Sequence, residues 1–290
     1  TLGIQLNRLP GQTSTVGVTA IDPFLFSFPL GIELGFDGEQ RDSTYGKQRY
    51  EAAITYKVLD GIDLSASVLR EATRPGQSGV AFTNGVQRIS RADALLAGVG
   101  IAYRNTDDPV NPRRGVVFRS SFERGSKSTT QRRIAEQDTV STKKNFRQER
   151  LDVSLRGYVP LAARHVAAVG VDAGLLRSDE YDASDLLRFG GASSLRGYNE
   201  EQFSGRFVNR FLVEYRYLLE RRSFAYLFVD VGVVERPEIE DQPEKTTVYP
   251  GYGFGLQFET GVGVVNATYA LNRDDGPTNG KIHVGLSFAL

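Results

Sequence analysis

Cysteine, methionine and tryptophan are absent from the 290-residue chain, and histidine occurs only twice, at His165 and His283. Without cysteine the chain forms neither disulfide bonds nor thiolate metal sites, and two histidines are too few for a histidine-rich metal site. We therefore expect no metal ion and no cofactor. The 35 basic and 35 acidic residues give a formal net charge of zero, which argues against binding of nucleic acid through a positive field.

Long apolar runs are also missing. No segment reaches the roughly 18 apolar residues that a membrane-spanning helix needs, so hydropathy alone is typical of a soluble protein. The chain begins Thr-Leu-Gly, without a basic-then-apolar leader. Together with the missing methionine, this beginning predicts a processed or excised piece of a longer protein.

Apolar and polar residues alternate along nearly the whole chain. Alternation with a period of two predicts β-strands, because successive side chains of a strand point to opposite faces. The faces opposite the apolar residues carry charges such as Glu33, Arg119 and Asp172. About fourteen strands are expected, around residues 2–6, 16–20, 30–36, 52–58, 62–68, 95–103, 116–122, 151–155, 167–173, 211–217, 225–231, 252–258, 265–271 and 282–290.

The connections between these strands are alternately short and long. Asp60-Gly61 is a tight turn, whereas 72–92 and 177–206 are long, and the charged segment 125–146 is expected to be a solvated surface loop. Short turns at one end and long loops at the other are typical of a barrel in a membrane, where every backbone polar group must be paired. We predict an all-β fold, a transmembrane antiparallel up-and-down β-barrel, with its C-terminus on the periplasmic side.

One segment of the long loop 177–206 is glycine-rich and compact rather than merely polar. It contains Phe189, Gly190, Gly191, Ser194, Leu195, Arg196, Gly197 and Tyr198. Carboxylates follow on the polar faces of the next two strands, at Glu214 and Asp230. This pattern resembles the outer-membrane barrel superfamily of BamA and TamA insertases and two-partner-secretion transporters, the bacterial surface antigen family. The hallmark of that family is a Val-Arg-Gly-Phe/Tyr tetrad, in which Leu195 here replaces the valine.

The resemblance implies a role for each of these residues. In the family this extracellular loop folds back into the barrel lumen, and its arginine pairs with two carboxylates, which correspond to Glu214 and Asp230. A guanidinium is a planar fork that two acceptors can hold at once, and it stays charged when buried. For Glu214 alone, an ion pair with neighbouring Arg210 or Arg216 is the alternative.

The remaining resemblance lies in a turn and at the C-terminus. Residues 105–115 are similar to an Asp/Asn-Pro/Gly turn of the family, although any turn rich in these residues has this composition. At the C-terminus, His283, Gly285, Phe288 and Leu290 fit the sorting signal of outer-membrane barrels and would form the last strand, beside the gate.

Family barrels have sixteen strands and follow periplasmic POTRA modules. By this comparison, 1–290 is a C-terminal transmembrane barrel domain that holds strands three to sixteen, without the first two strands and the POTRA modules. A barrel of fourteen strands that closes by itself is the alternative, because barrels with an even number of strands can close.

The function implied by the resemblance is assembly or translocation of proteins at the bacterial outer membrane, not catalysis. A seam between the first and last strands would open sideways, so that an incoming strand pairs with the exposed edge. The expected partners are the lipid bilayer, unfolded or nascent outer-membrane or secreted proteins, and periplasmic or lipoprotein accessory subunits, but no nucleic acid. A passive porin-type channel is the alternative. A barrel enzyme is a remote alternative, because His165 falls on the apolar face by alternation and His283 points inward with no obvious partner.

Overall fold

The computed structural model describes residues 2–9, 13–25, 28–135, 138–239, 242–261 and 263–287. Two compact units are distinguished. The first comprises Thr1–Ile101, Ser121–Leu151 and Leu176–Leu186, and the second comprises Ala102–Ser120, Asp152–Leu175 and Leu187–Leu290. Within the described ranges, no helix is long and apolar enough to cross a membrane.

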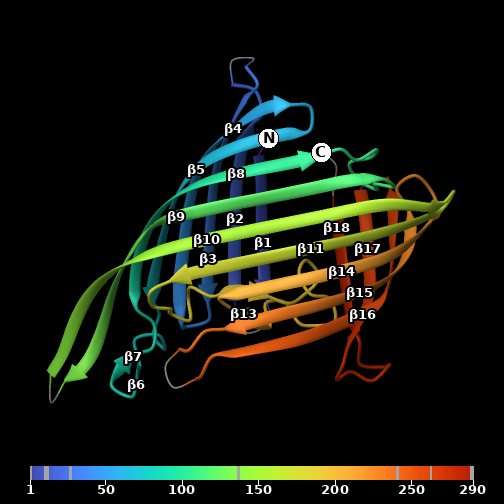
Figure 1. Cartoon of the computed structure of the whole chain (residues 1–290). Coiled ribbons are helices and arrows are strands. Elements are labelled where there is room, and N and C mark those ends of the chain that lie inside the picture. The colour runs from blue at the N-terminus through green and yellow to red at the C-terminus, as the bar shows by residue number, and fades with distance from the viewer. Residues whose placement is uncertain are drawn as a thin grey trace. The chain divides into compact units, whose positions relative to one another are not determined.

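The secondary structure consists of strands, and most of them form one antiparallel sheet (Figure 1). Fourteen strands follow one another in chain order, as predicted, and the short strands β6 and β7 are attached beside this path. In the first half these are β1 (Leu2–Leu9), β2 (Thr13–Asp22), β3 (Leu30–Arg41), β4 (Tyr45–Leu59), β5 (Ile62–Pro75), β6 (Phe82–Thr83), β7 (Val86–Gln87), β8 (Arg91–Arg104), β9 (Gly115–Ala135), β10 (Asp138–Ala162) and β11 (His165–Ser178).

The second half continues the same up-and-down order, and Figure 1 shows β14, β15 and β16 running side by side. A separate two-stranded sheet, β12 with β13, lies within the long loop. These strands are β12 (Leu187–Phe189), β13 (Phe203–Gly205), β14 (Phe207–Leu218), β15 (Phe224–Arg236), β16 (Lys245–Thr260), β17 (Gly263–Asn272) and β18 (Lys281–Ser287).

The two faces of the sheet differ in chemistry, as the alternation predicts. In β14, Phe211, Val213 and Tyr215 are exposed, whereas the side chains between them, such as Leu212 and Glu214, are buried. In each unit, large exposed apolar residues gather on one side of the strands, and we call this side the apolar face. The opposite side, the polar face, carries the buried charges. A sheet whose apolar side is the exposed one is suited to contact with lipid.

The prediction of a solvated loop at 125–146 is wrong. Strands β9 and β10 continue through this segment as a long hairpin, interrupted only at residues 136–137, which lie outside the described residues. Lys127 and Thr129 are buried there. The segment is polar because its side chains face charged partners and solvent, and polarity alone does not distinguish such a hairpin from a loop.

Candidate functional site

The glycine-rich segment forms a compact loop on a short strand pair. Phe189 of β12 pairs in register with Phe203 of β13, so the two ends of the loop are held together. Within the loop, the Gly190 amide donates to Oγ of Ser194 at 2.8 Å, and the Gly191 amide donates to the carbonyl oxygen of Leu195 at 3.0 Å. Both glycines have positive φ angles, of 118° and 105°, which side-chain-bearing residues rarely adopt.

Arg196 is the centre of the site. Its Nε and Nη2 donate to the two carboxylate oxygens of Asp230 at 2.8 and 2.6 Å, and its Nη1 donates to Oε1 of Glu214 at 2.7 Å. The backbone amide of Arg196 also donates to Asp230, at 3.3 Å. The guanidinium carbon lies 3.7 Å from the centre of the Phe228 ring. The structure therefore brings together the arginine and both carboxylates that the sequence singled out.

Both carboxylates are buried on the polar face, and Asp230 is 0% exposed. Asp230 lies in β15 opposite Leu212 of β14. Glu214 lies two residues further along β14, opposite Phe228. Glu214 also accepts two hydrogen bonds from Arg216, at 2.9 and 2.7 Å, whereas Arg210 pairs with Asp172. The ion pair with Arg216 that we considered as an alternative thus exists beside the one with Arg196. Because every oxygen has a donor, the cost of burying these charges is largely offset.

The residues on either side of Arg196 fix the loop through apolar packing. Leu195 is fully buried, in a cluster with Phe189, Tyr198, Val208 and Val234.

Tyr198 adds a polar contact to this cluster. Its hydroxyl donates to the carbonyl oxygen of Pro250 at 2.8 Å, and its ring packs edge-on against Phe203 and Tyr249. Burial, together with the nearby negative charge of Asp274, raises the pKa of Tyr198 to about 12, so the hydroxyl remains a donor.

Four further contacts of the loop were not found from the sequence. Asn272 of β17 donates from Nδ2 to the carbonyl oxygen of Gly197 at 2.8 Å. Gly197 has a φ of 92°, and a Cβ there would stand 2.5 Å from the carbonyl oxygen of Leu271. Gly251 of β16 and Phe228 of β15 likewise lie against Arg196. The loop therefore rests on the polar face of four consecutive strands, β14 to β17.

The C-terminal residues are only partly described. His283 lies in β18 opposite Thr268, and Gly285 lies opposite Asn266. Both line a cavity of about 260 Å³ that Arg196 and Glu214 also line. Phe288 and Leu290 lie outside the described residues.

The first part of the long loop, 179–186, makes a second set of contacts that the sequence did not predict. Asp185 forms a buried ion pair with Lys127 of β9. Asp182 accepts a hydrogen bond from the Ser90 amide at 2.9 Å, and the carbonyl oxygen of Ser184 accepts one from Lys47 at 3.2 Å. Burial and the neighbouring carboxylate of Asp185 raise the pKa of Asp182.

These contacts join a charged cluster on the polar face of the first unit. Glu71 accepts two hydrogen bonds from Arg150, at 2.9 and 3.0 Å, and pairs with Lys47 at 3.1 Å. Lys47 thus connects Glu71 to the loop. No sequence motif marks this cluster, because its members are scattered over four strands and one loop.

Comparison with known proteins places this geometry in a family. Residues 26–289 match the family model of the Omp85 superfamily domain. No curated protein matches the chain at a significant level of sequence similarity.

Two solved structures share the fold. The structure of BamA from Haemophilus ducreyi lacking POTRA domains 1–3 has a TM-score of 0.67 at 16% identity, over 97% of this chain and 62% of that one. CdiB from Acinetobacter baumannii has a TM-score of 0.51 at 14% identity, over 98% of this chain and 59% of that one. The chain thus spans about three fifths of the length of either structure. Its fold is the predicted antiparallel up-and-down transmembrane β-barrel, and the chain belongs to the Omp85 superfamily.

Proposed function

We propose that this chain assembles or translocates proteins at the bacterial outer membrane. Membership of the Omp85 superfamily supports this general function. The observation that carries the proposal at the level of residues is the pairing of Arg196 with Glu214 and Asp230. This pairing would hold the loop in one position by charge and geometry. A passive channel does not need a loop that is held in this way.

The loop has a mechanical role in this proposal. In a barrel of this fold the apolar face contacts lipid and the polar face lines the lumen. The loop on the polar face of β14 to β17 then fills part of the lumen and braces the C-terminal strands from inside. A guanidinium that holds two strands at once suits this role, because it restrains the strands relative to one another.

Substrate strands would enter at a seam beside the last strand, β18. An unpaired strand edge in lipid is costly, so a seam that opens favours pairing with an incoming strand. The substrates are then unfolded or nascent outer-membrane or secreted proteins, with periplasmic or lipoprotein subunits as helpers and the C-terminus on the periplasmic side. The bracing loop would keep β14 to β17 in register while β18 moves.

The proposal is tested by an assembly assay in lipid vesicles that contain the full protein. Arg196→Ala and Asp230→Ala are each expected to slow the folding of an added outer-membrane protein by about tenfold or more. Arg196→Ala leaves the buried Asp230 carboxylate without its cation, and Asp230→Ala removes two of the three side-chain hydrogen bonds of the buried guanidinium. The double variant is expected to add little to either. Arg222→Ala is the control, because Arg222 pairs with Glu259 at an exposed position. Wild-type rates in both single variants contradict the proposal.

Single-channel conductance in planar bilayers separates this function from that of a passive channel. We expect low conductance of the wild type and a clear increase on Arg196→Ala, because release of the loop would open the lumen. A large, constant conductance that the substitution leaves unchanged would mean that the loop does not occupy the lumen, and would favour the porin-type alternative.

A further inference from the structure

The connection between β17 and β18 is a turn, residues 273–280, that is built on the last residue of β17, Asn272. Oδ1 of Asn272 accepts hydrogen bonds from the amides of Asp274 and Asp275 at 2.8 and 3.1 Å. Asparagine often starts a turn in this way, because its side-chain oxygen reaches the amides of the residues that follow. The first half of the turn therefore depends on one side chain.

The same side chain also holds the glycine-rich loop. Asn272 is 7% exposed, and its Nδ2 donates to the carbonyl oxygen of Gly197 at 2.8 Å. A carboxamide can do both at once, because it carries two N–H donors beside its acceptor oxygen. Asn272 thus stands between the tip of the loop and the turn that leads into β18.

The turn carries this link onward to β18. Asp275, whose amide is held by Asn272, pairs through Oδ1 with Nζ of Lys281 at 3.5 Å. Lys281 is the first residue of β18 and lies opposite Ala270 of β17. A continuous path of polar contacts therefore joins Gly197 to the first residue of the last described strand.

The far end of the turn is held separately. The Tyr269 hydroxyl donates to the carbonyl oxygen of Pro277 at 2.5 Å and accepts a hydrogen bond from the Gly280 amide at 3.1 Å. Because this contact does not involve the loop, the turn can keep its second half when the contact at Gly197 is lost. The effect of that loss is then confined to the first half of the turn and to Lys281.

Direct packing between the loop and β18 is limited by a cavity. Arg196 of the loop and His283 and Gly285 of β18 line the same cavity of about 260 Å³. The loop is therefore not packed tightly against β18 at this point, and the path through Asn272 is the more direct connection.

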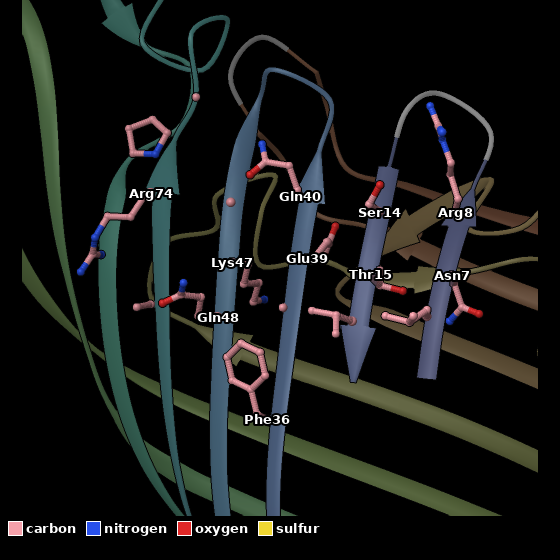
Figure 2. Close-up of a pocket in the computed structure, with 17 residues that line it drawn as sticks. Asn7, Arg8, Ser14, Thr15, Phe36, Glu39, Gln40, Lys47, Gln48 and Arg74 are labelled. Carbon is pink, nitrogen blue, oxygen red and sulfur yellow. The ribbon is translucent and has the colours of Figure 1, made fainter. Parts of the chain in front are cut away.

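The strand at the other end of the described sheet, β1, shows no comparable link. Asn7 and Arg8 lie near the end of β1, where they line a groove of about 820 Å³ (Figure 2). Both are exposed, and within the described part of the chain neither side chain has a hydrogen-bond or ion-pair partner. The link is thus a feature of β18 and not of the end strands of this sheet in general.

We propose that Asn272 is a positioning residue that couples the glycine-rich loop to β18. Loss of the Gly197 contact leaves Nδ2 as a buried donor without an acceptor, which is costly, so the turn rearranges and Lys281 separates from β17. The ion pairs of Arg196 with β14 and β15 do not depend on this contact, so β18 can open while the loop still braces those strands. The inference rests on the proposed function, in which β18 borders the seam where substrate strands enter.

Asn272→Asp separates this coupling from simple support of the turn. A carboxylate keeps an oxygen for the two amides of the turn but has no N–H for Gly197. Asn266→Asp is the matched control, because Asn266 lies in the same strand on the same face. Its Oδ1 accepts hydrogen bonds from Tyr226 and Thr268, not from the loop.

Amide hydrogen exchange, followed by mass spectrometry on the full protein in lipid vesicles, measures the opening of β18. We expect the amides of residues 281–284 to exchange about fivefold faster in Asn272→Asp than in the wild type, the effect of losing one hydrogen bond, and Asn266→Asp to match the wild type. Arg196→Ala, which releases the whole loop, should accelerate the same amides in the wild-type background but not in Asn272→Asp. This lack of additivity is the sign of coupling through Asn272.

Lys281→Gln tests the path from its other end, at a side chain that is 31% exposed, and so keeps the test open if Asn272→Asp does not fold. It should accelerate exchange in β18 while the loop stays resistant to protease. Lys245→Gln, at the exposed first residue of β16, is its control.

Wild-type exchange of β18 in Asn272→Asp or in Lys281→Gln overturns the proposal, and so does a further acceleration by Arg196→Ala in the Asn272→Asp background. Assembly of an added outer-membrane protein, measured on the same variants, keeps this inference apart from the proposed function. Faster exchange of β18 with unchanged assembly confirms the coupling and contradicts a seam beside β18. Altered assembly with unchanged exchange overturns the coupling alone.

Discussion

A methyl group added to Gly251 would stand 2.0 Å from the carbonyl oxygen of Arg196, closer than any two such atoms approach. Gly251 lies in the interior of β16, where glycine weakens a strand, so its presence there has a cost. The cost is offset because glycine has no side chain, so that the backbone of the loop can contact the strand at this point. This contact places the Arg196 guanidinium between Glu214 and Asp230.

Gly251→Ala is therefore expected to lift the loop. The added methyl group forces the backbone of residue 196 away from β16 and lengthens the hydrogen bonds of the guanidinium. We expect the free energy of unfolding to fall by about 1–3 kcal/mol, the usual effect of overpacking, and the loop to become accessible to protease. Gly276→Ala is the control, because a Cβ at Gly276 meets no atom within 4 Å. Equal stability of the two variants would contradict the close approach.

The ion pair between Arg196 and Asp230 is expected to be strongly coupled in stability. Removing either partner leaves the other buried, so Arg196→Ala and Asp230→Ala should each cost about 3–5 kcal/mol. The double variant should cost much less than the sum. Guanidinium titrations of the four proteins, in a lipid or detergent where unfolding is reversible, give the coupling energy directly.

A second cycle on Arg222 and Glu259 provides the matched control for this measurement. Their side chains are 36% and 44% exposed, and their ion pair has a donor–acceptor distance of 2.8 Å, similar to that of the buried pair. An exposed pair of this kind contributes at most about 1 kcal/mol. A coupling energy between Arg196 and Asp230 no larger than this would show that burial adds nothing to the pairing.

Much of this fold could be predicted from the sequence, because apolar and polar side chains must alternate along a strand that lies between lipid and a polar interior. Period-two alternation gave the fourteen strands and the face on which Glu214 and Asp230 lie. It failed at 125–146, where Lys127 and its neighbours are polar on both faces. In this segment the two strands of the hairpin pair with each other, and neither has an apolar face by which alternation could reveal a strand.

Only part of the candidate site could be predicted from the sequence. Arg196 and its carboxylates belong to a recognisable pattern, so their pairing could be expected. Gly251 and Asn272 could not, because their importance depends on where the loop comes to rest, which no local pattern encodes. The same holds for Asp185 and Lys127, which are separated by 58 residues in sequence.

The buried pair of Lys127 and Asp185 is expected to hold the first part of the long loop. Lys127→Ala leaves the Asp185 carboxylate buried beside Asp182 without its cation, which should cost about 3–5 kcal/mol in the free energy of unfolding. Lys144→Ala is the control, because Lys144 and Glu180 join the same hairpin to the same segment at exposed positions. Denaturant titration compares the two. A loss below about 1 kcal/mol in both variants would contradict a structural role for the buried pair.

The turn between β8 and β9 is expected to lose stability as the pH falls. Oδ1 of Asp108 accepts hydrogen bonds from the amides of Val110 and Asn111 at 2.8 and 3.0 Å. These amides, and more weakly the charge of Arg221, hold the pKa of Asp108 below its ordinary value of 3.8. A carboxylate whose pKa is lowered on folding stabilises the protein fully above the unfolded pKa, and this contribution is lost as the pH falls through the folded pKa. Asp108→Asn keeps an acceptor oxygen but no charge, so it should be less stable than the wild type at neutral pH.

The stability difference between the wild type and Asp108→Asn should stay constant above about pH 5, as expected for a group with an unfolded pKa near 3.9, and should shrink below it. Denaturant titrations at a series of pH values measure this difference. Asp274→Asn, at a side chain that is 80% exposed, controls for the removal of one carboxylate. A difference that grows as the pH falls would mean that the amides of the turn do not stabilise the charged form of Asp108.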